Sequence, residues 1–175
     1  MMKKHLLAVL MGAGLTFGFV AQGFAADNLL HAKLIDPNGK ETGLIEVQGT
    51  YKGILISVSA EGLSPGWHGV HFHGTGDCSD HMDHFKKSGG HMNKEGQTHG
   101  YLDAKGPHLG DLPNIWINKD GTGKADFFTD SITLSELADR DGAALMIHAG
   151  ADDYKGQPAG NSGDRVACGV LGQSD

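Results

Sequence analysis

Positive charge is scarce in this 175-residue sequence, which has 14 lysines and arginines, 21 aspartates and glutamates and a net charge of −7. Proteins that bind nucleic acid neutralise phosphates and are usually basic, so the charge argues against a nucleic-acid partner.

Strong helix formers are sparse, whereas glycine is abundant at 28 residues. This composition favours an all-β fold with many turns, and the sequence has neither an internal repeat nor a second domain.

A membrane-spanning stretch is also missing. The apolar run from Leu6 to Val20 follows Lys3 and Lys4 but is too short to span a bilayer, and no stop-transfer pattern follows it. Small residues then stand at 23 and 25, and no cysteine there could take a lipid. We therefore predict a secretory signal peptide over residues 1–25, cleaved after Ala25 or Ala26. The domain of residues 26–175 is expected in the periplasm, free of the membrane after cleavage, with full secretion as the alternative.

Cysteine is limited to Cys78 and Cys168. An even pair in an exported protein predicts one disulfide, because the compartment is oxidising. The alternative is a pair of buried free thiols.

Alternation of apolar and polar residues, together with short apolar runs between turn signals, predicts eight short strands. We expect them within residues 29–35, 44–50, 51–60, 67–73, 114–117, 124–128, 143–148 and 165–171. Thr133 and Glu136 have the spacing of a capping box, which predicts one short helix to about residue 138. Short strands with regular turn signals indicate an antiparallel sandwich or barrel, closed or nearly closed.

Two connections between these strands are long, residues 74–112 and 149–164. Structureless loops of this length in a compact domain are usually functional or disordered. The first loop is rich in histidine, so we interpret it as functional.

The histidines suggest metal ligands. His71 and His73 stand two apart on a predicted strand, so their side chains share one face and could bind a transition metal. Three imidazoles and a carboxylate could complete a tetrahedral zinc site, and the first loop offers His91, His99, His108 and Asp111. Ordinary surface histidines, or a loop that binds metal only loosely, are the alternatives. His148, which ends a distant apolar strand, weakens them.

Several runs carry a specific resemblance, namely GVHFH at 69–73, GGHMN at 89–93, HG at 99–100, GPHLGDLPN at 106–114 and GDRVACGV at 163–170. With these runs, essentially the whole of residues 26–175 resembles the copper/zinc superoxide dismutase family. The signal peptide and the residues inserted after Cys78 are most similar to its periplasmic bacterial branch. The resemblance implies an eight-stranded antiparallel Greek-key barrel or sandwich with two long functional loops.

The resemblance also implies a role for each candidate residue. Copper would bind to His71, His73, His91 and His148, and zinc would bind to His91, His99, His108 and Asp111, so that His91 bridges the two ions. Arg165 would dock the anionic substrate beside copper, with His91 as the second catalytic residue. Asp152 would accept hydrogen bonds from His71 and His99. Cys78 and Cys168 would form the disulfide of the family.

The implied activity is dismutation of superoxide to dioxygen and hydrogen peroxide by alternate reduction and oxidation of copper, while zinc holds His91. The alternative is a non-catalytic periplasmic protein that binds copper or zinc on the same fold. Inactive relatives typically lose a copper ligand or the arginine, and this sequence keeps both. A monomer and a homodimer both remain open. His81 and His84 lie outside the family's ligand set and suit either a polar exposed loop or an auxiliary metal or haem contact.

Overall fold

The computed structural model describes residues 28–172, so the predicted signal peptide lies outside the described residues. Eight strands, two 3-10 turns and one short helix follow in the order β1 (Leu29–Ile35), β2 (Glu41–Gly49), β3 (Ile54–Ala60), β4 (Gly66–His73), η2 (His81–Asp83), η3 (Lys86–Ser88), β5 (Asp111–Ile117), β6 (Gly123–Thr129), α1 (Leu134–Leu137), β7 (Ala143–His148) and β8 (Arg165–Leu171). The predicted capping box of Thr133 and Glu136 is present at α1.

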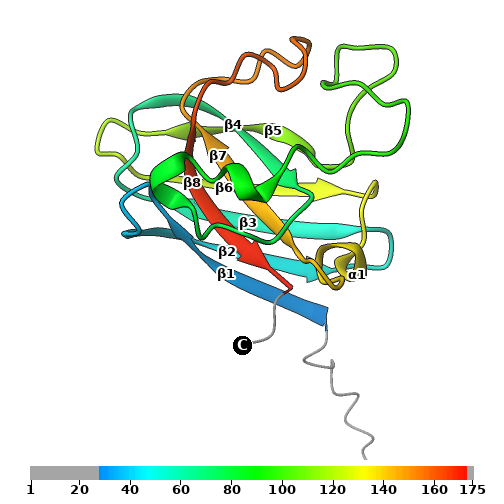
Figure 1. Cartoon of the computed structure of the whole chain (residues 1–175), viewed down its shortest axis with the longest axis horizontal. Helices are drawn as coiled ribbons and strands as arrows, with labels where there is room; N and C mark the ends of the chain where they lie inside the picture. The colour runs from blue at the N-terminus through cyan, green and yellow to red at the C-terminus, as the bar shows by residue number, and fades with distance from the viewer. Residues whose placement is uncertain (1–27, 173–175) are drawn as a thin grey trace, which may run out of the picture.

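The strands form one antiparallel sheet in the order β5-β4-β7-β8-β1-β2-β3-β6. The two halves of the sheet join through β1 and β8, where Ile35 pairs with Cys168. The strands at the two ends of this order, β5 and β6, are consecutive in sequence and lie next to each other. The sheet therefore curls into a nearly closed barrel (Figure 1), and the predicted all-β, eight-stranded architecture is confirmed.

The core is filled by the alternate residues that the sequence pattern predicts. Ile54, Ile56 and Val58 of β3 are buried on one face and pack against Ile45 and Val47 of β2 inside the barrel. Burying a side chain of this size stabilises the fold by about 1.5–3 kcal/mol relative to leaving it in water. The barrel is therefore a rigid base for the loops that it carries.

Strand β5 begins at Asp111, three residues before the predicted start at Asn114. Pro113 obscured this start because proline interrupts the hydrogen-bond ladder of a central strand. Strand β5 stands at one end of the sheet order, where a missing backbone N–H is tolerated. The earlier start places Asp111 opposite His71 of β4.

Strand β7 differs from the alternating strands because all six of its residues are buried. Ala143, Leu145 and Ile147 face the barrel core, whereas Ala144 and Met146 pack with the disulfide and Phe85 outside the barrel. The long connection over residues 74–110 therefore covers the outer face of β7, with η2 and η3 in front of the barrel (Figure 1).

Among the described residues, no helix has the length and apolar character needed to cross a membrane.

Candidate metal centre

Strand β4 presents His71 and His73 on the face opposite the barrel core. Val70 and Phe72, their neighbours in sequence, are part of the core, so alternation along the strand turns both imidazoles outward. His71 is fully and His73 almost fully inaccessible, and their rings contact Asp152 and Gly89 of the two long connections. The prediction that these two histidines share one face is confirmed.

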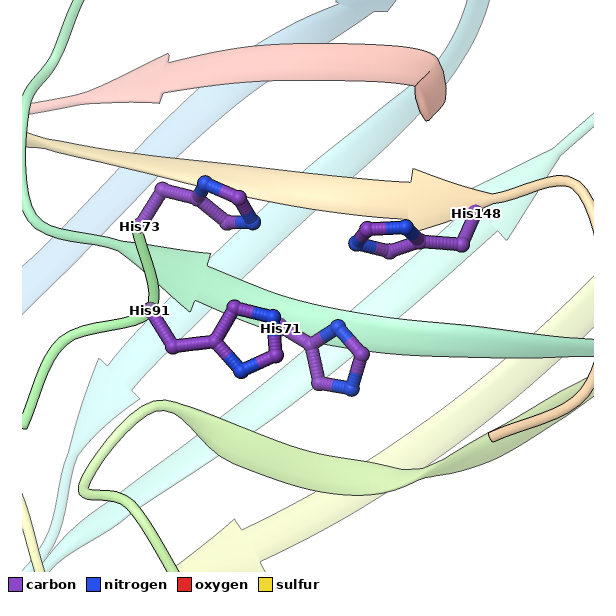
Figure 2. A group of neighbouring side chains, drawn as sticks. All are labelled: His71, His73, His91 and His148. Carbon is purple, nitrogen blue, oxygen red and sulfur yellow. The ribbon is translucent and has the colours of Figure 1, made fainter. Parts of the chain in front are cut away.

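His91 and His148 reach the same place from other parts of the chain. His91 forms an isolated bridge with His73, and His148 ends β7, the strand that pairs with β4. One ring nitrogen from each of the four histidines lies within 4.8 Å of those from the other three. Figure 2 shows the rings of His71, His73, His91 and His148 gathered around one common space.

Each of these four imidazoles uses its two nitrogens differently. Four ring nitrogens are buried without a hydrogen-bond partner among the described residues, namely His71 Nδ1, His73 Nε2, His91 Nε2 and His148 Nε2. The other nitrogen of each ring has a hydrogen-bond partner. For His71 it is Asp152 at 2.8 Å, for His73 the Gly89 carbonyl at 2.9 Å, for His91 Asp111 at 2.9 Å and for His148 the Gly163 carbonyl at 3.1 Å. Buried polar atoms are rarely left unpaired, and metal-binding histidines donate their second N–H to such acceptors. The four free nitrogens therefore fit a transition-metal ion.

Burial keeps the imidazoles of His71, His73 and His148 neutral. Removal from water lowers the pKa of His71 to about 4, of His73 to about 2 and of His148 to about 3. A neutral imidazole keeps the lone pair that a metal needs. The site is therefore ready to bind a cation at neutral pH without first releasing protons from these rings.

A second group of ligand atoms surrounds the Asp111 carboxylate. Its Oδ1 lies 2.9 Å from His91 Nδ1, 3.0 Å from His99 Nδ1 and 3.6 Å from His108 Nδ1. Its Oδ2 accepts the backbone N–H groups of Gly100 at 2.8 Å and His108 at 3.0 Å. Three imidazoles and one carboxylate suit a closed zinc site.

Either His71 or His108 could be the fourth residue of this second group. The ligand atoms of His71, His91, His99 and Asp111 also lie within 4.8 Å of one another. However, His71 already uses Nε2 on Asp152 and directs Nδ1 to the first group. His108 Nδ1 is buried without a hydrogen-bond partner among residues 28–172 and lies 3.6 Å from Asp111 Oδ1. His108 therefore completes this group better than His71.

The negative charge of Asp111 in the second group is balanced by a proton on His99. Burial opposes charge on His99, but its hydrogen bonds to Asp111 and Asp152 outweigh burial and raise its pKa to about 9. Burial likewise opposes charge on Asp111, but hydrogen bonds from His91 and His99 hold its pKa far below the ordinary value. A divalent cation would supply the positive charge that the carboxylate otherwise takes from His99.

Asp152 contacts one imidazole in each of the two groups. Its Oδ2 lies 2.8 Å from His71 Nε2, and its Oδ1 lies 3.0 Å from His99 Nε2. These hydrogen bonds, opposed by burial, lower the pKa of Asp152. A side chain at Gly160 would collide with Asp152 and His99, so glycine permits this close approach. The carboxylate therefore fixes one imidazole in each group.

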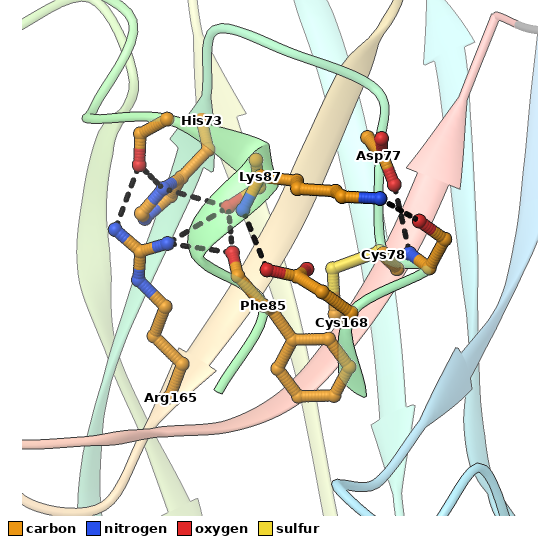
Figure 3. The surroundings of a disulfide bond; sticks show 11 residues. His73, Asp77, Cys78, Phe85, Lys87, Arg165 and Cys168 are labelled. Atoms are coloured by element: carbon orange, nitrogen blue, oxygen red, sulfur yellow. Dashed lines mark hydrogen bonds between the residues drawn. A yellow bond between two sulfur atoms is a disulfide. The ribbon is translucent and has the colours of Figure 1, made fainter. Parts of the chain in front are cut away.

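Arg165 lies beside the first group, at the start of β8 and opposite His148 in the strand register. Its Nη1 donates to the Phe85 carbonyl at 2.7 Å and the Ser88 Oγ at 3.1 Å, and its Nη2 donates to the Gly89 carbonyl at 2.7 Å. Partial burial lowers its pKa, but a guanidinium stays charged at any ordinary pH. Figure 3 shows the guanidinium between His73 and Phe85.

The disulfide between Cys78 and Cys168 is present, with the two Cα atoms 6.0 Å apart, so this prediction is confirmed. It ties the loop over residues 74–110 to β8, the strand that carries Arg165 (Figure 3). The Phe85 ring is fully buried against this disulfide and Met146.

His68, His81 and His84 lie outside the two groups of ligand residues. His68 is buried with its ring nitrogens 2.6 Å and 2.8 Å from the carbonyls of His148 and Ser64, so both nitrogens are used on the backbone. His81 has Nδ1 3.0 Å from the Pro37 carbonyl, and His84 is exposed. Neither belongs to a metal-ligand group within residues 28–172.

Sequence reasoning missed the partners of Arg165. Phe85 and Gly89 act through backbone carbonyls, which carry no side-chain signal, and Ser88 is an ordinary residue for a loop. Gln157 was also missed; it accepts the His99 N–H and donates to the His99 carbonyl, both at 2.9 Å. No pattern in the sequence predicts either contact.

Comparison with known proteins agrees with this geometry. The family model for copper/zinc superoxide dismutase (SODC) matches residues 41–171. The chain is 39% identical to superoxide dismutase [Cu-Zn] 2 of Aquifex aeolicus, over 96% of this chain and 99% of that protein. It is 39% identical to superoxide dismutase [Cu-Zn] of Caulobacter vibrioides, over 77% and 80% of the two chains. This chain therefore belongs to the copper/zinc superoxide dismutase family.

A solved structure gives the same fold. The crystal structure of a double mutant of a SOD-like protein from Bacillus subtilis superposes with a TM-score of 0.76 at 38% identity, covering 81% of this chain and 95% of that one. The strand order and the barrel are therefore features shared with this family.

Proposed function

We propose that this protein is a copper- and zinc-dependent superoxide dismutase, which converts two superoxide anions and two protons into one dioxygen and one hydrogen peroxide. The observation that carries the proposal is the convergence of four buried, unpartnered imidazole nitrogens beside a half-buried guanidinium. Membership of the copper/zinc superoxide dismutase family supports the same reaction.

The first group of residues would hold copper and the second would hold zinc. The copper ligands would be His71, His73, His91 and His148, and the zinc ligands would be His91, His99, His108 and Asp111. Bound copper would supply the one-electron redox chemistry that dismutation needs, whereas zinc has no redox chemistry. His91 belongs to both sets because its two nitrogens face different groups.

Two side chains of the protein would act on the substrate. The Arg165 guanidinium attracts superoxide and presents N–H donors to it, because a fork of donors suits a small anion. His91 Nε2 has no other hydrogen-bond partner among the described residues, so it would hold a proton when it is not bound to copper and could release that proton to the developing peroxide. Asp152 keeps His71 and His99 oriented throughout.

We also propose that the protein works in the periplasm, after removal of residues 1–25. The basic start, short apolar run and small residues of that segment support export. The disulfide between Cys78 and Cys168 supports an oxidising compartment.

The stoichiometry of the products tests the proposed reaction. Purified protein loaded with copper and zinc is given a known amount of superoxide, and peroxide and dioxygen are both measured. Dismutation predicts one peroxide and one dioxygen for every two superoxide anions consumed. A yield of one peroxide per superoxide would indicate reduction by an external donor, and no consumption above the zinc-only protein would indicate a carrier without catalysis.

A further inference from the structure

Ser88 has a position that neither the metal ligands nor the docking arginine explain. It is the last residue of η3 and is fully buried. Its Oγ lies 2.8 Å from the Phe85 carbonyl, 3.1 Å from Arg165 Nη1 and 3.3 Å from His73 Nδ1. One small hydroxyl therefore touches both the guanidinium and an imidazole of the proposed copper site.

The three contacts use the full hydrogen-bonding capacity of that hydroxyl. A serine hydroxyl has one hydrogen to donate and two lone pairs to accept with. A carbonyl oxygen only accepts, so the hydroxyl hydrogen points to Phe85. The lone pairs are then left to accept from the Arg165 N–H and the His73 N–H.

The next carbonyl along the chain joins the same two side chains. Gly89 O accepts from His73 Nδ1 at 2.9 Å and from Arg165 Nη2 at 2.7 Å. His73 must therefore carry its hydrogen on Nδ1, which leaves Nε2 bare and aimed at the common space of the four histidines. Ser88 and Gly89 thus hold two edges of the guanidinium against one imidazole.

The turn that carries Ser88 is fixed at both ends. Its backbone N–H donates to the Phe85 carbonyl at 3.1 Å, and its own carbonyl accepts the Thr75 N–H at 3.2 Å. The Phe85 ring packs against the disulfide between Cys78 and Cys168 (Figure 3). The hydroxyl therefore has a set position with respect to β8 and β4.

We propose that Ser88 is a positioning residue, whose hydroxyl fixes the Arg165 guanidinium relative to His73 so that an anion meets both in one orientation. The proposal rests on the proposed function, in which Arg165 docks the anion and His73 binds copper. A side chain held by fixed acceptors loses less freedom when it binds, so affinity for the anion should depend on the Ser88 hydroxyl.

The test uses azide, a small univalent anion and a copper ligand, on the full-length mature protein loaded with copper and zinc. Ser88→Ala should retain both metals, weaken azide binding about three- to tenfold and shift the copper EPR spectrum, because a hydrogen bond to a charged group and one to His73 are lost. Ser88→Thr, which keeps the hydroxyl, should restore most of the affinity. Ser79→Ala is the matched control, because Ser79 lies on the same loop and its Oγ accepts from Lys87 instead.

Unchanged azide affinity and an unchanged EPR spectrum in Ser88→Ala would overturn the proposal, and so would an equal change in Ser79→Ala. If Ser88→Ala fails to fold, Ser88→Cys keeps the volume with a much weaker hydrogen-bonding group, and wild-type azide affinity there would overturn it equally. Both readouts are independent of turnover. A wild-type protein without dismutase activity would refute the proposed function, whereas these measurements would still decide the role of Ser88.

Discussion

The imidazoles of His71 and His91 stack with their ring centroids 3.9 Å apart and an angle of 28° between their planes. His71 Nε2 is hydrogen-bonded to Asp152, and His91 Nδ1 is hydrogen-bonded to Asp111. Each ring keeps one buried nitrogen without a partner among the described residues. The contact brings the two metal-ligand groups together, because His91 Nδ1 lies on Asp111 while the ring also belongs to the group that contains His71 and His73.

The first prediction concerns this double role of His91. A crystal structure of the oxidised protein with both metals bound should show His91 Nε2 on copper and Nδ1 on zinc, each at about 2.0–2.2 Å. Anomalous scattering at the two absorption edges identifies the ions. A fully metallated oxidised crystal in which His91 turns away from either ion would contradict the assignment.

The second prediction concerns Asp152→Asn. An amide has one oxygen acceptor and an NH2 group, so it cannot accept hydrogen bonds from both His71 and His99 as the carboxylate does. Affinity for copper and for zinc should each fall roughly 10- to 100-fold, measured by competition with chelators. Asp153→Asn is the matched control, because that neighbour is exposed and contacts neither histidine. Loss of one metal alone would show that Asp152 does not connect the two sites.

The third prediction concerns Arg165. Arg165→Ala should keep both metals while kcat/KM falls roughly 10- to 100-fold, because a charge-assisted contact with the anion is lost. Arg165→Lys should be intermediate, since it keeps the charge but lacks the fork of donors. Metal content and superoxide decay are measured on the same samples. Wild-type turnover of Arg165→Ala at low salt would exclude the docking role.

The fourth prediction concerns the disulfide, which closes a separation of 90 residues. Replacing Cys78 and Cys168 with serine should lower the free energy of unfolding by about 4–5 kcal/mol in the chain-entropy model. The measurement is urea unfolding of the metal-free protein. A change below about 1 kcal/mol would mean that packing of Phe85 and Met146 keeps the loop closed without the bond.

The sequence predicted most of the barrel for a physical reason. Alternation exposes one face of a strand to water, so residues such as Ile54, Ile56 and Val58 identify their strand and their face. The pattern failed at the start of β5, where Pro113 lies in a strand at the end of the sheet order. The apolar run of β7 indicates burial, but not which segment covers its outer face, because the loop over residues 74–110 is distant from β7 in the chain.

The metal centre was only partly predictable. The spacing of His71 and His73 on one strand predicts that they share a face, and the structure confirms it. Spacing alone cannot bring His148 to the same place, because that depends on β4 and β7 pairing across the sheet. Two of the three contacts that hold Arg165 are backbone carbonyls, of Phe85 and Gly89, and no side-chain pattern could show these two.

Direct observation of superoxide decay tests the central claim most simply. Decay is followed by its ultraviolet absorbance after pulse radiolysis, with catalytic amounts of the copper- and zinc-loaded protein and the zinc-only protein as the control. We predict decay that is first order in superoxide, with a rate constant proportional to the concentration of copper-loaded protein and many turnovers per chain. A rate indistinguishable from that of the zinc-only protein at every concentration would contradict the assignment of this protein as a superoxide dismutase.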